Sequence, residues 1–230
     1  MSWAEIFKIN TNMKRPLNEQ LRDMNFRPMR IITSTGTYTP EKTGKYMVIC
    51  VGAGGDGIGK ATSASQYGCS GGGGGVAIKT LTLSKSTAYN VTVGTTASFT
   101  FNASTIITAT SGSSGSSSAG GTGGTASGGD SNYAGTSGST TTSWYKAPTG
   151  GSVGVAISEL TCSPAPVFTT LTRKDTGVST PVTLQYGDSI LYYGGGGTGA
   201  HFYNGSSDSQ TFNTTGKPAA VIIVPLEMEE

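Results

Sequence analysis

Two glycine motifs in this chain have the spacing of nucleotide-binding loops. A GxGxxG begins at Gly52 directly after an apolar run, and a phosphate-loop spacing runs from Gly54 to Lys60. The first needs a helix after it and an acidic residue for a ribose, but residues 58–75 are poor in helix formers and residues 71–80 hold no acid. The second has Ala61 where a hydroxyl should hold magnesium. We therefore expect no nucleotide and no other cofactor.

Residues for acid–base or nucleophilic chemistry are few and scattered. His201 is the one histidine, so a Ser/His/Asp set would have to use it, and it lies in a glycine loop. The three cysteines, Cys50, Cys69 and Cys162, show no CxxC and no metal-ligand spacing. We expect no catalytic residue, no metal site and no enzyme activity. A glycosidase pair from distant loops stays open, because spacing in sequence does not fix spacing in space.

The composition excludes several classes of partner. Hydrophobic residues make up 35% and charged residues 12% of the 230 residues, with a net charge of +2, which gives no electrostatic case for nucleic acid or an anionic membrane. No arginine occurs between Arg30 and Arg173, which removes a glycine-rich RNA-binding segment. No apolar run approaches the roughly 20 residues of a spanning helix. The first residues lack a signal segment, so synthesis in a cytoplasm is expected.

Residues 52–140 are a tract of glycine, serine, threonine and alanine that organises the chain. Such residues bury almost no apolar side chain to offset the entropy of ordering them. Gly112, Gly115, Gly121 and Gly124 share a three-residue register, the period of extended left-handed helices in which glycine allows close approach. The tract is either ordered by backbone contact or a loose linker.

The flanking segments favour order. Residues 46–51 read as a buried strand, and residues 76–93 alternate as a hairpin turning at Ser84–Thr87. Residues 98–110 predict a second strand pair that folds about Asn102, and residues 220–224 predict a strand that ends at Pro225. The expected fold is all-β, a small β-sandwich or barrel framework at 35–230 carrying glycine-rich loops.

Residues 1–34 differ from the rest, because helix formers and charge concentrate there. Trp3, Ile6, Phe7 and Ile9 can form one apolar face, and Pro16 opens a second short helix. The segment is too small to fold alone. It is either packed on its own domain or, as we favour, an attachment and oligomerisation segment for a larger body.

The order of parts resembles the glycine-rich domain of tailed-phage tail-fibre and receptor-binding adhesins. The matching blocks are TYTPEKTGKYMVICVGAGG, the GGGGG run, VAIKTLTLSKSTAYNVTVG, ASFTF, ITATSG and GKPAAVIIV. The resemblance implies a β-framework with loops that in some members pack as polyglycine-II helices. It implies a virion protein that binds a bacterial surface glycan or protein, and fibre symmetry makes a homotrimer the expected oligomer. In such a virion protein, the attachment segment would contact other phage structural proteins through Trp3, Ile6, Phe7 and Ile9. The alternatives are a purely structural virion component (head fibre, collar or baseplate part) and a surface depolymerase.

Aromatic residues among small polar ones suit recognition, because they give rigid contact at low entropic cost. The expected receptor-binding residues are Trp144, Tyr145, Tyr133, Tyr67, His201, Phe202 and Tyr203. For each, the alternative is an aromatic that covers the thin core or a seam between subunits. For Tyr192 and Tyr193, at a strand end, we favour that alternative.

Overall fold

The computed structural model describes residues 29–62, 65–141, 150–154, 167–173, 180–186, 193–197, 199–202 and 210–229. Every regular element in these ranges is a β-strand, and the ranges contain no helix that could cross a membrane. All strand pairs within them are antiparallel. The expected all-β class is confirmed for the described residues, whereas the N-terminal helices fall on residues 1–28, outside them.

One five-stranded sheet, here called sheet A, has the order β1-β17-β3-β6-β11. Its strands are β1 (Arg30–Ile32), β17 (Ala220–Met228), β3 (Gly44–Val51), β6 (Val76–Leu83) and β11 (Ser131–Tyr133). The apolar run at residues 46–51 is the central strand, as its pattern predicts. The predicted end of the last strand at Pro225 is wrong: β17 continues to Met228, and a register shift between Pro225 and Glu227 accommodates the proline.

A second five-stranded sheet, sheet B, has the order β10-β9-β8-β7-β2. Its strands are β10 (Ala126–Ser127), β9 (Thr105–Thr110), β8 (Thr96–Asn102), β7 (Tyr89–Thr92) and β2 (Gly36–Tyr38). The predicted pair about Asn102 is confirmed as β8 and β9. Asn102 makes the turn, since its Oδ1 accepts the N–H groups of Ser104 and Thr105 at 3.0 and 2.7 Å.

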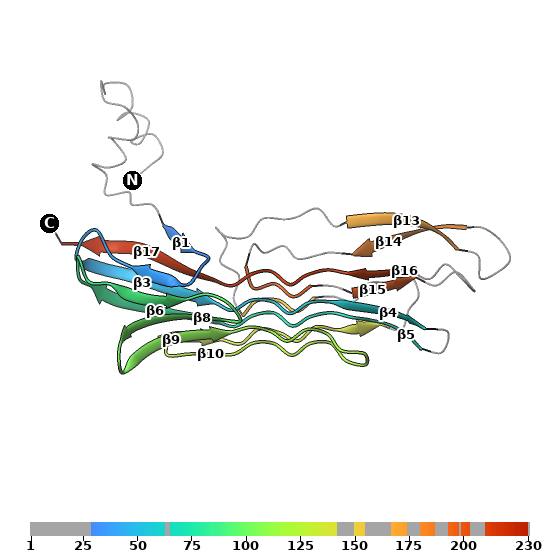
Figure 1. The fold of residues 1–230 in the computed structure, drawn as a ribbon, viewed down its shortest axis with the longest axis horizontal. Coiled ribbons are helices and arrows are strands. Elements are labelled where there is room, and N and C mark those ends of the chain that lie inside the picture. The colour runs from blue at the N-terminus through green and yellow to red at the C-terminus, as the bar shows by residue number, and fades with distance from the viewer. Residues whose placement is uncertain are drawn as a thin grey trace, which may run out of the picture.

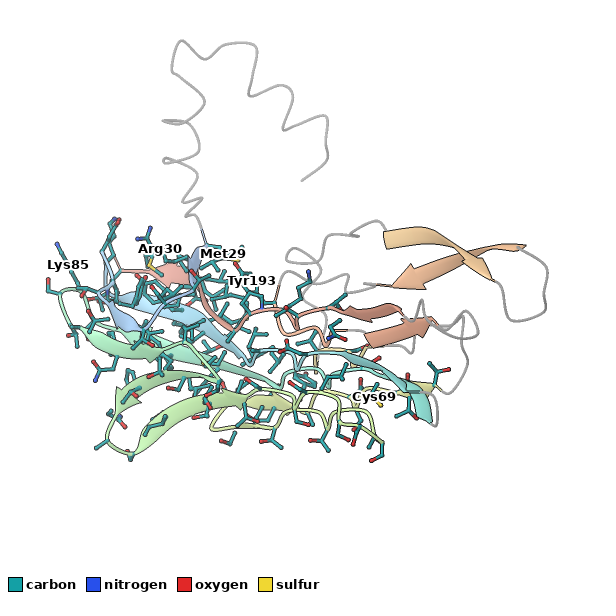
Figure 2. All side chains as sticks on the ribbon, turned by 45° about the vertical axis from the view of Figure 1, so that its right-hand side comes forward. Met29, Arg30, Cys69, Lys85 and Tyr193 are labelled. Atoms are coloured by element: carbon teal, nitrogen blue, oxygen red, sulfur yellow. The ribbon has the colours of Figure 1, made fainter. Side chains whose placement is uncertain are left out.

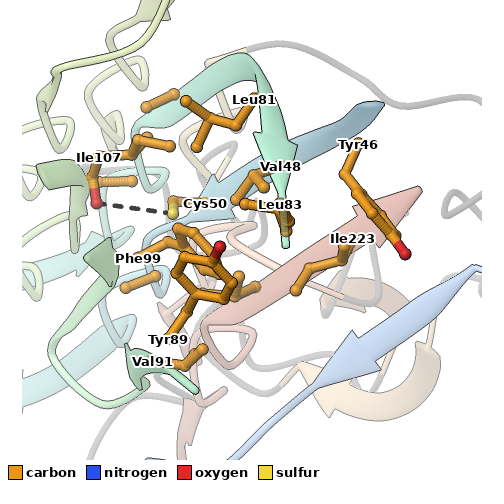
Figure 3. Close-up of a cluster of buried hydrophobic side chains, with 14 of the residues drawn as sticks. Tyr46, Val48, Cys50, Leu81, Leu83, Tyr89, Val91, Phe99, Ile107 and Ile223 are labelled. Atoms are coloured by element: carbon orange, nitrogen blue, oxygen red, sulfur yellow. Dashed lines mark hydrogen bonds between the residues drawn. The ribbon is translucent and has the colours of Figure 1, made fainter. Parts of the chain in front are cut away.

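The two sheets share one hydrophobic core (Figure 3). Sheet A contributes side chains such as Val48, Leu83 and Ile223, and sheet B contributes Phe99 and Ile107, all fully buried. Tyr89 stacks on Phe99 with ring centroids 5.6 Å apart. Because both sheets place alternate residues into this cluster, they face each other across it.

The predicted hairpin over residues 76–93 is wrong. β6 pairs with β3 and β11 in sheet A, while β7 pairs with β8 and β2 in sheet B. Leu83 and Tyr89 both point into the shared core from opposite sheets, so the connection between them crosses from one sheet to the other. The Tyr89 hydroxyl accepts the Ser84 N–H at 2.9 Å and fixes this crossing.

Three smaller sheets complete the described chain (Figure 1). One contains β12 (Thr140–Thr141), β5 (Ser65–Cys69) and β4 (Ile58–Thr62). The others are the hairpins of β13 (Val167–Arg173) with β14 (Thr180–Tyr186) and of β15 (Gly199–Phe202) with β16 (Gln210–Asn213). Sheets A and B lie at one end of the elongated molecule with the described termini, and the small sheets lie at the other.

Candidate functional site

Glycine-rich segments connect the two ends of the molecule and pack side by side as a bundle (Figure 1). The segments of this glycine bundle are residues 52–57, 70–75, 110–115, 121–125, 135–139, 151–154, 194–197 and 214–218. Several of them begin at a strand end, such as 52–57 after β3, whereas 110–115 and 121–125 are joined to each other by a turn. Their hydrogen bonds run between segments, and most join main-chain atoms.

Residues 70–75 form the central segment, with six other segments around them. The N–H groups of Ser70 to Gly75 donate to three neighbours in turn, and their carbonyl groups accept from three others, so each neighbour is met at every third residue. The N–H groups of residues 70 and 73 donate to segment 135–139, and those of residues 71 and 74 donate to segment 194–197. The N–H groups of residues 72 and 75 donate to segment 110–115. The carbonyl groups of residues 70 and 73 accept from segment 121–125, and those of residues 71 and 74 accept from segment 151–154. The carbonyl groups of residues 72 and 75 accept from segment 52–57. A period of three with bonds to surrounding chains is the geometry of hexagonally packed polyglycine-II helices.

Close approach of main chains explains why residues 71–75 are all glycine. A Cβ on Gly71 would lie 1.9 Å from the Gly55 carbonyl oxygen, and one on Gly73 would lie 2.0 Å from that of Ser152. The remaining three would meet a carbonyl oxygen at 2.0–2.2 Å. Their backbone lies in a region open to any L-residue, so the missing side chain is what the packing requires.

The three-residue register within the Ser/Gly-rich tract is confirmed as a packing pattern. Gly112 and Gly115 donate to Ala53 and Asp56 carbonyl groups, while Gly121 and Gly124 donate to Ser70 and Gly73. All four glycines are buried. The tract at 110–125 is therefore ordered by main-chain contact, and the loose-linker alternative fails for these residues.

Serine and threonine hydroxyls cap the outer edge of the bundle. Thr110 donates its N–H to the Thr125 carbonyl, and its Oγ1 accepts the Thr125 N–H at 2.8 Å. The pairs Ser113 with Thr122 and Thr136 with Ser152 repeat this arrangement, with distances of 2.8 and 2.7 Å. At these edge positions a side-chain oxygen replaces the missing neighbouring segment, which is why hydroxyl residues interrupt the glycines.

The nucleotide-like motifs are part of this packing. Gly52, Gly54 and Gly57 donate their N–H groups to the carbonyl oxygens of Gly75, Lys217 and Thr214. Gly59 donates to Asn213 Oδ1 at 2.7 Å. Because a phosphate loop binds through free N–H groups that converge on the anion, these glycines have no donors left for one.

The end of the bundle far from sheets A and B is the candidate functional site, here called the far end. Segments 52–57 and 70–75 carry the β4–β5 hairpin there, and segments 194–197 and 214–218 carry β15–β16. The two hairpins lie against each other. β12 extends β5 at its edge, where Thr141 pairs with Gly68. The main chain of both hairpins is thus continuous with hydrogen-bonded segments of the bundle.

The structure brings three of the expected binding residues to this end. Tyr67 lies in β5, and His201 and Phe202 lie in β15. Tyr133 lies elsewhere: it pairs with Val76 at the edge of sheet A and is 40% exposed. Trp144, Tyr145, Tyr192 and Tyr203 are outside the described residues, as are Trp3, Ile6, Phe7 and Ile9. Tyr193 packs on apolar residues of sheet A, which confirms its expected structural role.

Several titratable groups in the described ranges are held in structural contacts. Asp56 Oδ1 accepts the Gly216 N–H at 2.8 Å. Lys79 Nζ lies 2.7 Å from Asp130 Oδ1, and this hydrogen bond, together with the Thr80 N–H, holds the pKa of Asp130 below its usual value. Burial raises the pKa of Cys50 to about 12, and both Cys50 and Cys69 are free thiols. Within the described ranges no His, Cys, Asp and Glu side chains gather as metal ligands would.

The hydroxyl caps are the feature of the bundle that sequence reasoning missed. Serine and threonine interrupt the glycines and complete the edge of the bundle. The sequence contained a signal for these caps. Thr110 and Ser113 are three residues apart, as are Thr122 and Thr125, so the hydroxyl residues follow the same period as the glycines.

Comparison with known proteins identifies a family for most of the chain. The sequence model of the family described as "Glycine-rich domain" matches residues 33–221. No curated protein matches the chain significantly.

Proposed function

The chain belongs to the glycine-rich domain family, and from this premise we propose that it is a bacteriophage tail-fibre or tail-tip adhesin. The proposed activity is non-covalent binding of a bacterial surface glycan or protein by the far end. The proposed arrangement is a homotrimer on the virion, joined to other phage structural proteins through Trp3, Ile6, Phe7 and Ile9 of the N-terminal segment, with no catalytic step.

One observation carries this proposal: the described segments that lead to β4–β5 and β15–β16 at the far end are held by main-chain bonds of the glycine bundle. Residues 70–75 keep six neighbouring segments in place without any side-chain core. Far-end side chains can therefore change without loss of the bundle, which suits a surface that must adapt to a changing receptor. Tyr67, His201 and Phe202 supply the aromatic and imidazole groups that stack on sugars and bind polar groups there.

The test is binding of the labelled full-length protein to a panel of bacterial strains. A triple variant at the far end, Tyr67→Ala with His201→Ala and Phe202→Ala, is expected to lose binding while it keeps the melting temperature. The matched control is Thr92→Ala with Ser98→Ala and Thr108→Ala, one row across the outer face of sheet B, and it is expected to bind normally.

Other outcomes would redirect the proposal. Unchanged binding by the far-end variant would contradict it. A protein that sediments with purified particles but binds no strain would be a purely structural virion component. Release of new reducing ends from host capsule would identify a depolymerase.

A further inference from the structure

The outer face of sheet A, turned away from sheet B, carries a second apolar cluster. Its buried members are Ile49, Val51, Val76, Val153, Ala220 and Ile222. The partly buried members are Met29, Met47, Ile78, Tyr193 and Val224. An antiparallel sheet with one side in a core commonly has its other side polar, so a doubly apolar sheet needs a second cover.

The strand register shows how far this face extends. Ile31, Ile222, Ile49 and Ile78 pair in sequence across β1, β17, β3 and β6 and form one continuous isoleucine row. The next row contains Val224 and Met47, which pair directly. Val153 and Tyr193 come from the bundle segments and cover the side of the face near the bundle. Met47, Ile78 and Val224 remain partly exposed, and Ile31 is 37% exposed.

The chain itself enters the structure on this face. Met29, the first described residue, packs against the outer cluster, and β1 begins at the next residue (Figure 2). The preceding 28 residues are therefore attached at the edge of the uncovered apolar rows. Two other undescribed stretches, 155–166 and 187–192, adjoin the face near Val153 and Tyr193, on the side toward the bundle and not beside the exposed rows.

The residues just before Met29 have the pattern that this face requires. Leu17, Leu21 and Met24 have an i, i+4, i+7 spacing, which places them on one side of a helix that Pro16 can open. Nine helical residues measure about 14 Å, and a five-stranded sheet is about 19 Å across. The five Cα-to-Cα steps from Met24 to Met29 span up to about 17 Å, enough to reach the middle of the sheet.

We propose that residues 16–28 of the same chain cover the outer face of sheet A, with Leu17, Leu21 and Met24 against Met47, Ile78 and Val224. This places a third layer over sheet A and completes the core at that end. It also leaves the apolar residues of 1–15 free for another protein. The docking does not depend on what the far end binds.

The first test is proximity in the full chain. In a Cys162→Ser background, where the two other cysteines are buried, Leu21→Cys combined with Met47→Cys is treated with a short bis-maleimide. We expect an intramolecular cross-link found by peptide mass spectrometry in the monomer band. The matched control is Leu21→Cys with Thr92→Cys on the opposite outer face, which is expected not to link. A cross-link between two chains would overturn the proposal and assign the face to a second copy.

The second test measures whether residues 16–28 shield Met47 from solvent. Replacement of Leu17, Leu21 and Met24 by glutamine should leave sheets A and B folded while it exposes Met47. We expect amide protection within residues 16–28 to disappear and oxidation of Met47 by peroxide to accelerate several-fold. Equal Met47 oxidation in the variant and the parent, with unprotected amides at 16–28 in both, would refute the docking.

Discussion

Substitution of Gly73 by alanine tests whether main-chain contact is what holds the glycine bundle together. Gly73 lies in the central segment, where it donates to Thr136 at 2.9 Å and accepts from Gly124 at 2.8 Å. An alanine Cβ would lie 2.0 Å from the Ser152 carbonyl oxygen, against 3.4–4 Å for an ordinary contact. Because that atom belongs to a backbone, no rotamer change can make room.

The size of the expected loss comes from these contacts. Overpacking in a tight interior costs about 1–3 kcal/mol, and weakening the two hydrogen bonds adds about 0.5–1.5 kcal/mol each. The Gly73→Ala variant should therefore lose about 2–6 kcal/mol of unfolding free energy, a large part of the roughly 5–15 kcal/mol of a typical domain. Denaturant titration monitored by circular dichroism measures this loss.

Gly36→Ala is the matched control. Gly36 is an exposed glycine in β2 with nothing within 4 Å of its Cβ position and no positive φ. The same chemical change should leave stability unchanged or raise it by about 0.4–1 kcal/mol, because alanine restricts the unfolded chain. Equal unfolding midpoints for the two variants would refute the packing argument.

Three further predictions concern the centre of the bundle, its hydroxyl caps and the Asp130–Lys79 ion pair. Amide exchange should be slowest at residues 71–75 and slow at Gly112 and Gly124; rapid exchange at these positions would mean that the segments are not held together. Thr110→Val should accelerate exchange of the Thr125 amide and lower stability by about 0.5–1 kcal/mol, whereas Thr92→Val on an exposed strand should not. The lowered pKa of Asp130 means that its ion pair with Lys79 stabilises the fold above the unfolded pKa of about 4 and is lost as pH falls through the lower folded value. The difference in melting temperature between the parent and Asp130→Asn should shrink on acidification, and a pH-independent difference would contradict this.

Local sequence patterns identified the strands but not their partners. Alternation at Leu81, Leu83, Tyr89 and Val91 correctly marks residues that face the core. Alternation cannot tell whether two strands lie in one sheet or face each other from two, because either arrangement points the same residues inward. After Leu83 the chain passes from sheet A to sheet B, so the two strands face each other and the hairpin prediction failed.

The three-residue spacing of the glycines could likewise be recognised in the sequence. The segments that pack against these glycines could not. A three-residue spacing reports that a segment is approached closely at every turn of the helix. Which segments become neighbours depends on where the preceding strands end. Residues 52–57 follow β3 and therefore lie beside residues 70–75. Of the candidate site, the chain brings Tyr67, His201 and Phe202 to one end, whereas β11 places Tyr133 at the edge of sheet A.

Burial of main chain in place of apolar side chains also changes how stability depends on temperature. Apolar surface exposed on unfolding raises the heat capacity, whereas exposed polar surface lowers it. The glycine bundle buries carbonyl and N–H groups with almost no side chains, so it adds little to the heat-capacity change of unfolding. A smaller change flattens the stability curve, since curvature of free energy with temperature is set by this quantity. Sheets A and B supply the hydrophobic core that drives folding, and the bundle extends from them a rod whose stability varies little with temperature, the property required of the proposed adhesin outside a cell.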